Sequence, residues 1–99
     1  MIRLGRPSEA IHILEKCVEY KPRDIYYKNL GDAYYCVGIL EKAVKNYDAA
    51  LGLNPTMDEA EYNLATAMLM LNQMREAKRH VTRAIKIKPD NEDYQQLSQ

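Results

Sequence analysis

Three prolines mark an internal repeat, which constrains the fold of this 99-residue chain more than any other feature. Pro22, Pro55 and Pro89 each follow an apolar segment, at separations of 33 (55 − 22) and 34 (89 − 55) residues. The same step relates pairs of identical residues: Asn29 and Asn63, Leu30 and Leu64, Ala33 and Ala67, Ala43 and Ala77, and Ala50 and Ala84. A period of this length indicates a repeat protein, in which each unit is stabilised by packing against its neighbours.

Within one period the apolar residues have the spacing of two helices. The first stripe contains Tyr27, Leu30, Gly31, Tyr34 and Val37, and the second contains Leu40, Ala43, Val44, Tyr47, Ala50 and Leu51. Gly38 lies between the stripes, where a helix C-terminus favours a residue that adopts positive φ. Asp24 and Asp58 begin the first helix of each unit, and Glu59 and Glu61 suit the positive end of its dipole. Because no long segment alternates with period 2, the sequence predicts an all-α fold.

This unit resembles the tetratricopeptide repeat. In residues 24–57 every signature position of that family is filled, by Tyr27, Leu30, Gly31, Tyr34, Ala43, Tyr47, Ala50 and Pro55. Residues 58–91 match at Leu64, Ala65, Ala77, Ala84 and Pro89, whereas Glu61, Met68 and Val81 replace the aromatic residues. The resemblance implies a right-handed α-α superhelix, a solenoid of helical hairpins whose first helices line a concave face.

The resemblance covers nearly the whole chain and predicts one domain over residues 1–99. Residues 1–22 form a partial repeat with only the second helix (8–20), residues 24–57 and 58–91 form full repeats, and residues 92–99 begin a further helix or cap. Residues 1–4 look like the tail of a helix, and Gly5 occupies the turn position. We expect Ile11, Leu14 and Val18 to lack a covering helix, and helix 8–20 therefore to support self-association or to belong to a longer chain.

Ten residues on the first helices are candidates for a peptide-binding concave face. They are Ile25, Lys28, Asn29, Asp32 and Tyr35 in one repeat and Tyr62, Asn63, Thr66, Leu69 and Met70 in the next, flanked by Glu59 and Gln73. Exposed tyrosine and aliphatic side chains among polar groups suit a peptide or helix of another protein. Lys28 and Asp32 are spaced to pair, which predicts a moderately hydrophobic ligand and little salt dependence. The alternative is a solvated helix face with a few apolar residues.

Some members of the family bind an acidic C-terminus through a clamp of Lys, Asn and Arg residues. Lys28 and Asn63 match two clamp positions, but Asp32 occupies the position of an Asn. Glu92 and Gln96 occupy the positions of the basic residues, so that an acid would face the carboxylate of the ligand. The sequence therefore argues against such a clamp.

The charge balance and the lengths of the apolar runs argue against several other classes of function. With 14 basic and 14 acidic side chains the formal charge is zero, which argues against a nucleic-acid-binding protein. The longest apolar run, residues 67–71, is too short for membrane insertion. A basic stripe of Arg75, Arg79, Arg83 and Lys86 is interpreted as a solvated outer face, and docking of an acidic partner is the alternative.

The remaining reactive residues suggest no catalytic, metal or cofactor site. Cys17 and Cys36 form no C-x-x-C pair, and His12 and His80 lack the spacing of metal ligands. Cys17 is expected in the core, as are Met68, Met70 and Met74, with Met70 alternatively on a binding surface. Free thiols suit a cytoplasmic or cytosol-facing location.

The sequence thus predicts a non-catalytic protein-interaction module that binds another protein. Two alternatives remain open. One is a segment of a larger enzyme or transferase whose repeats present substrates, and the other is a self-assembling structural scaffold.

Overall fold

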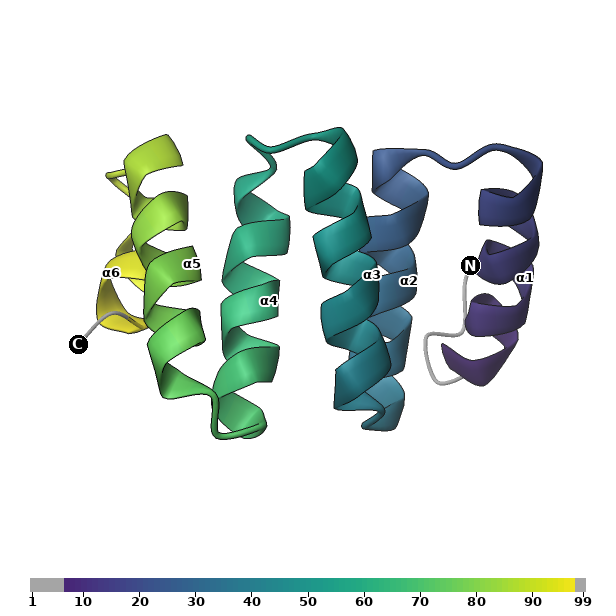
Figure 1. Cartoon of the computed structure of the whole chain (residues 1–99), viewed down its shortest axis with the longest axis horizontal. Coiled ribbons are helices and arrows are strands. Elements are labelled where there is room, and N and C mark those ends of the chain that lie inside the picture. The colour runs from purple at the N-terminus through teal and green to yellow at the C-terminus, as the bar shows by residue number, and fades with distance from the viewer. Residues whose placement is uncertain (1–6, 98–99) are drawn as a thin grey trace.

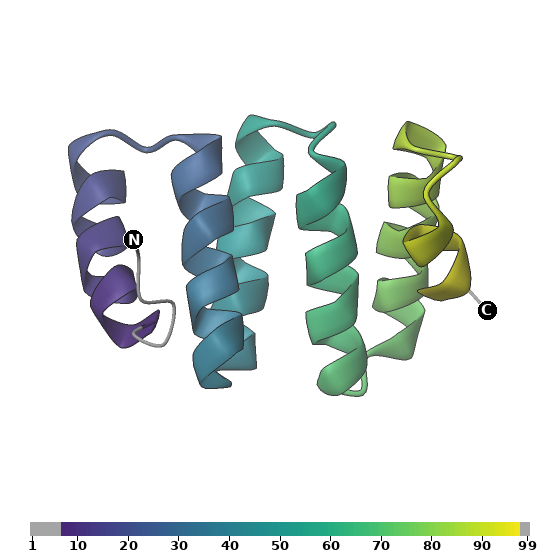
Figure 2. The same ribbon diagram turned by 180° about the vertical axis from the view of Figure 1, so that it is seen from behind.

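The structure, a computed structural model, describes residues 7–97. In this part of the chain it contains six helices and no strand: α1 (Pro7–Tyr20), α2 (Asp24–Val37), α3 (Leu40–Leu53), α4 (Asp58–Met70), α5 (Met74–Ile87) and α6 (Glu92–Leu97). The helices follow one another along an axis from α1 to α6, with α3 and α5 on the side seen in Figure 1 and α2 and α6 on the side seen in Figure 2. The predicted all-α solenoid is confirmed.

The turns within the two hairpins occupy equivalent repeat positions. Gly38 has a φ of 84°, and the N–H groups of Gly38 and Ile39 bond the carbonyls of Tyr35 and Tyr34 at 3.0 Å each. Gly38 thus ends α2 in the left-handed backbone conformation that the sequence predicts at this turn. Asn72, which is 34 residues further on, has a φ of 66°. Asparagine therefore replaces glycine there, because it tolerates this conformation better than other residues with a side chain.

Small residues bring the helices close together in the core. Alanines 43, 50, 60, 65, 77 and 84 are each at most 1% exposed. Among larger side chains, Tyr47, Leu64 and Val81 are completely enclosed. Tyr34 and Tyr47 are buried among these helices, and Tyr27 packs against the core partly buried.

Helix α1 contradicts the expectation of an uncovered apolar stripe. Ile11, Leu14 and Val18 are partly buried and pack against the core, because α1 turns this stripe toward α2. Its outer face instead exposes Ile13, which is 61% accessible. Cys17, expected in the core, is only half-buried. Residues 1–4, Gly5, Ser98 and Gln99, to which the sequence analysis also assigned roles, lie outside the described residues.

The methionines are a second correction. Met68 lies in the core, whereas Met70 and Met74 are each 60% exposed because they flank the turn between α4 and α5. No helix within residues 7–97 is long and apolar enough to span a membrane.

Glu61 lies in the first turn of α4, as the sequence predicts, and its side chain is buried. It is 3% exposed, and its Oε1 lies 2.5 Å from Nδ1 of His80 on α5. Arg83 Nη1 lies 4.0 Å from its other oxygen. Burial raises the pKa of the nearby Asp48 carboxyl, with His80 acting in the opposite direction and Glu61 in the same direction. A polar cluster therefore joins α4 and α5, the two helices of the second full repeat, where the family pattern has an aromatic residue.

Candidate functional site

A pocket of about 470 Å³ lies between α2, α3 and α4. We call it the tyrosine pocket, and its lining residues are Asp32, Tyr35, Cys36, Tyr47, Tyr62, Asn63 and Thr66. Five of them were candidates from sequence, namely Asp32, Tyr35, Tyr62, Asn63 and Thr66. They meet because α2 and α4 present equivalent faces one repeat apart. Sequence reasoning missed Cys36 and Tyr47, and it had assigned Tyr47 to the core by its repeat position.

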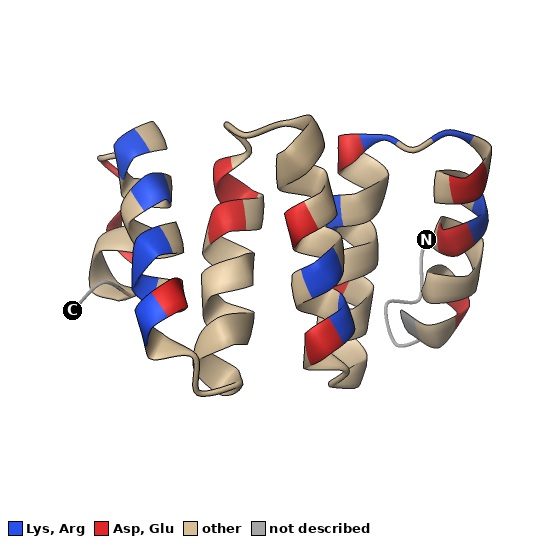
Figure 3. Ribbon diagram, in the orientation of Figure 1, with Lys and Arg blue, Asp and Glu red and all other residues tan. Residues whose placement is uncertain are grey.

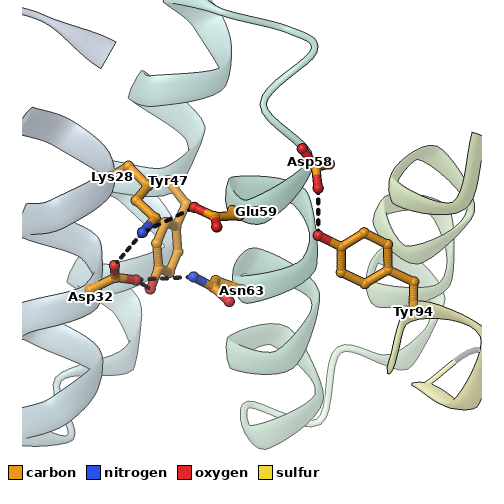
Figure 4. A network of polar contacts seen from close by, with 7 residues as sticks. All are labelled: Lys28, Asp32, Tyr47, Asp58, Glu59, Asn63 and Tyr94. Atoms are coloured by element: carbon orange, nitrogen blue, oxygen red, sulfur yellow. Dashed lines mark hydrogen bonds and ion pairs between the residues drawn. The ribbon is translucent and has the colours of Figure 1, made fainter. Parts of the chain in front are cut away.

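Asp32 is the centre of the polar network in this pocket. Its Oδ1 accepts hydrogen bonds from the Tyr47 hydroxyl and from Asn63 Nδ2, the latter at 3.1 Å (Figure 4). Burial, followed by the bond to Asp32, raises the pKa of Tyr47. The Asn63 amide, a candidate for the concave face, therefore has a partner within the protein. One carboxylate joins helices α2, α3 and α4.

Lys28 completes this network with two acidic partners. Its Nζ lies 2.9 Å from Asp32 Oδ2 and 3.4 Å from Glu59 Oε1 on α4, as Figure 4 shows. Only 16% of the Lys28 side chain is exposed. Burial alone would lower its pKa, but Asp32 and Glu59 outweigh that effect and raise it. The predicted Lys28–Asp32 pair is present, but it is half-buried and shared with an acid of the next repeat.

Tyr62 packs against the last helix. Its ring centroid lies 4.9 Å from that of Tyr94 on α6, and the Tyr94 hydroxyl donates to Asp58 Oδ2 at 2.6 Å. Tyr94 is 4% exposed, and its ring packs against that of Tyr62. Thr66 bonds the Tyr62 carbonyl at 3.0 Å within α4. The short terminal helix therefore fixes one wall of the tyrosine pocket.

The other five candidates do not line the pocket. Ile25 is 44% exposed at the start of α2, Met70 is 60% exposed at the end of α4, and Lys28, Asn29 and Leu69 are partly buried. Leu69 packs against the core instead of presenting its side chain to the pocket. A ligand that extends beyond the pocket could contact Ile25 or Met70 at opposite ends of the first helices.

A second hollow, of about 650 Å³, lies between α1, α2 and α3. Two acids of α1, Glu15 and Glu19, and two lysines of α3, Lys42 and Lys45, line it. The Tyr34 hydroxyl bonds Glu15, and Lys42 lies 5.5 Å from the centre of the Tyr34 ring. Tyr34 therefore already contacts both Glu15 and Lys42 at this hollow.

The basic residues of α5 form a separate surface. Arg75, Lys78, Arg79, Arg83 and Lys86 are exposed along this helix, which is predominantly blue in Figure 3. Within the described residues, no group of three or more His, Cys, Asp or Glu side chains is arranged to hold a metal ion.

Comparison with protein families identifies the repeat. Family models described as "Tetratricopeptide repeat" match residues 38–99 and 2–24. The "TPR repeat-containing thioredoxin TTL4" of Arabidopsis thaliana is 31% identical over 98 residues, which are 98% of this chain and 14% of that protein. Anaphase-promoting complex subunit 7 of Dictyostelium discoideum is 31% identical over 67 residues, 68% of this chain and 12% of that protein. The chain thus spans at most about one seventh of the curated relatives it matches.

Solved structures share the fold over nearly the whole chain. MamA superposes with a TM-score of 0.93 at 25% identity, covering 96% of this chain and 56% of MamA. The first TPR of Spaghetti (RPAP3), bound to an HSP90 peptide of sequence SRMEEVD, gives a TM-score of 0.92 at 23% identity and covers 95% of this chain and 75% of that one.

Proposed function

Because the chain belongs to the tetratricopeptide repeat family, we propose that it is a non-catalytic interaction module that binds a peptide or helical segment of another protein at the tyrosine pocket. The observation that carries this proposal is the meeting of Tyr35, Tyr62, Asn63 and Thr66 around one hollow between successive first helices. Tyrosine provides large contact area at a low cost in conformational entropy, which suits peptide recognition.

Structural neighbours support a peptide as the ligand. The RPAP3 repeat was solved with an HSP90 peptide, and YrrB, with a TM-score of 0.88, is described as a TPR protein with an unusual peptide-binding site. At 23% and 22% identity these structures establish the shared fold alone. The acidic terminus of the HSP90 peptide suits this chain poorly, because Lys28, the single basic residue of α2, α4 and α6, is already paired with Asp32 and Glu59.

Selection from a random peptide library displayed on phage tests this proposal. Peptides that bind the intact chain should lose binding when Thr66→Arg fills the pocket and when Tyr35→Ala removes one of its walls. A large anchoring side chain typically contributes about 2 kcal/mol or more. Tyr20→Ala is the matched control, because Tyr20 is 88% exposed on α1 and lies outside the pocket. If Thr66→Arg and Tyr35→Ala bind the selected peptides as the parent does, the site is elsewhere.

A second candidate function is that the repeats present a partner within a larger protein. The relatives named as a thioredoxin and as protein O-mannosyl-transferase TMTC1 of Mus musculus favour it, because this chain corresponds to 14% and 9% of their lengths. Any catalytic activity would then belong to other parts of the larger protein. Self-association through α1 would depend on exposed Ile13, and Ile13→Glu would abolish it.

A reducing, cytosol-facing compartment suits the cysteines. Cys17 and Cys36 are both free thiols, and Cys36 is exposed beside the pocket. An oxidising environment would put this exposed thiol at risk of intermolecular disulfide formation. Fluorescence microscopy of the tagged chain would test this location.

A further inference from the structure

We propose that the segment bound at the tyrosine pocket is basic, and that one of its lysine or arginine side chains enters between Tyr35 and Tyr62. This inference rests on the proposed function and assigns a chemical class to its ligand. It replaces the expectation from sequence of a ligand whose affinity changes little with salt.

The first helices of the repeats are strongly acidic. Helices α2, α4 and α6 contain a single basic residue, Lys28, and seven acidic residues: Asp24, Asp32, Asp58, Glu59, Glu61, Glu92 and Asp93. Glu61 is buried against His80, and Asp24 and Asp58 accept hydrogen bonds from Asn54 and Tyr94. The carboxylates tied to the tyrosine pocket are therefore Asp32, which lines it, and Glu59, which shares Lys28 with Asp32. Figure 3 shows the contrast with α5, where basic residues predominate. The chain is neutral as a whole, but helices α2, α4 and α6 carry a net negative charge, whereas α5 carries a net positive one.

Lys28 does not offset this charge at the pocket. Its ammonium lies within 3.4 Å of two carboxylates, those of Asp32 and Glu59, so the three groups together carry a net charge of −1. The raised pKa keeps Lys28 charged and paired at neutral pH. Glu59 is 69% exposed, and it can therefore contact a ligand cation while it remains near Lys28.

The pocket walls provide the second element of cation recognition. Tyr35 and Tyr62 are partly buried, so each ring has part of its surface open to solvent. A guanidinium or ammonium group is attracted to the face of an aromatic ring, by about 0.5–2 kcal/mol depending on its desolvation. The volume of about 470 Å³ is within the range of about 300–1,000 Å³ usual for ligand pockets and holds a single long side chain with space to spare.

The peptides selected from the random library test this inference. We expect every family of selected peptides that competes for the pocket to contain lysine or arginine and to contain few acidic residues. Synthetic copies of the best peptide, with its arginine replaced by citrulline, isolate the charge, since citrulline is nearly the same size and neutral. We expect citrulline to weaken binding by about fivefold or more, and binding to weaken several-fold between about 50 and about 500 mM NaCl.

Two protein variants provide the matched comparison. Glu59→Gln removes a carboxylate beside Lys28. It should weaken binding of the arginine peptide by about two- to fourfold and leave binding of the citrulline peptide unchanged. Glu41→Gln removes the same charge from an exposed position on α3 outside the pocket and should change neither. Selected peptides that compete for the pocket but are neutral or acidic would overturn this inference and leave the proposed function standing. Peptides that bind the Thr66→Arg variant as tightly as they bind the parent would overturn both this inference and the proposed function.

Discussion

Gly31 of α2 lies so close to Tyr47 of α3 that a Cβ atom on the glycine would be 2.7 Å from two carbons of the tyrosine ring. Tyr47 is 1% exposed, and its hydroxyl is bonded to Asp32 in the pocket. The ring therefore cannot move aside without breaking this bond. The glycine that lets the hairpin close is also what places the Tyr47 hydroxyl at the candidate site.

Gly31→Ala is expected to destabilise the chain by about 1–3 kcal/mol, because a methyl group there overpacks an enclosed contact. Gly52→Ala is the matched control, since Gly52 also lies in a helix but has no atom within 4 Å of its added Cβ. There alanine should stabilise the chain, by at most about 1 kcal/mol, through helix propensity. Urea denaturation followed by circular dichroism measures both. Equal stabilities of the two variants would show that the contact is not tight.

His80→Ala should cost about 3–5 kcal/mol, because it leaves the Glu61 carboxylate buried without its nearest partner. The preceding repeat has Tyr27 and Asn46 at the equivalent positions, 34 residues earlier. The double variant Glu61→Tyr/His80→Asn removes the buried charge and should be clearly more stable than His80→Ala. Thermal unfolding compares the two. If the His80→Ala variant unfolds at the same temperature as the parent, water or Arg83 stabilises the buried Glu61 carboxylate in place of His80.

Tyr34 and Tyr47 should ionise late in an alkaline titration, as should Tyr94. The hydrogen bond to Glu15, with burial, raises the pKa of Tyr34 to about 12. Burial and then Asp32 raise the pKa of Tyr47, and burial and then Asp58 raise that of Tyr94. Because these folded-state values exceed the unfolded value of about 10, their stabilisation is complete below about pH 10 and is lost as the pH rises through the folded values.

Ultraviolet absorbance of tyrosinate measures this titration. Three of the eight tyrosines should ionise late in the native protein, and the delay should disappear in concentrated urea. Tyr34→Phe should remove one late group. A native titration that coincides with the one in urea would contradict the hydrogen bonds assigned to these hydroxyls.

Tyr94→Ala should destabilise the chain by about 3–5 kcal/mol, as expected for truncation of a buried aromatic residue. Tyr94→Phe keeps the ring against Tyr62 and removes only the bond to Asp58, at a cost of about 0.5–1.5 kcal/mol. Since a helix of six residues is stable only through its packing, hydrogen exchange in residues 92–97 should quicken in the alanine variant alone. Equal protection in both variants would mean that α6 is held by other contacts.

The repeat and the helices could be predicted from the sequence because they depend on local spacing. The proline period and the two apolar stripes fixed the helix positions, and Gly38 marked a turn that needs positive φ. The same periodicity set that α2 and α4 present one face to the tyrosine pocket, with Asp32 and Thr66 at equivalent positions. Tyr35 and Tyr62 are not equivalent in the repeat, and only the packing of the two helices brought them to one pocket. The interpretation of α1 failed because spacing shows that a stripe exists, but not which neighbour covers it.

Only the tertiary structure decided which polar side chains pair between helices. Glu61 with His80, and Asp32 with Asn63, are 19 and 31 residues apart in the sequence. Lys28 reaches Glu59 as well as Asp32, so that one lysine is shared by two carboxylates of successive repeats. Such pairs depend on the direction and reach of single side chains after the helices have packed. A periodic sequence sets which faces meet, and packing sets which atoms on those faces touch.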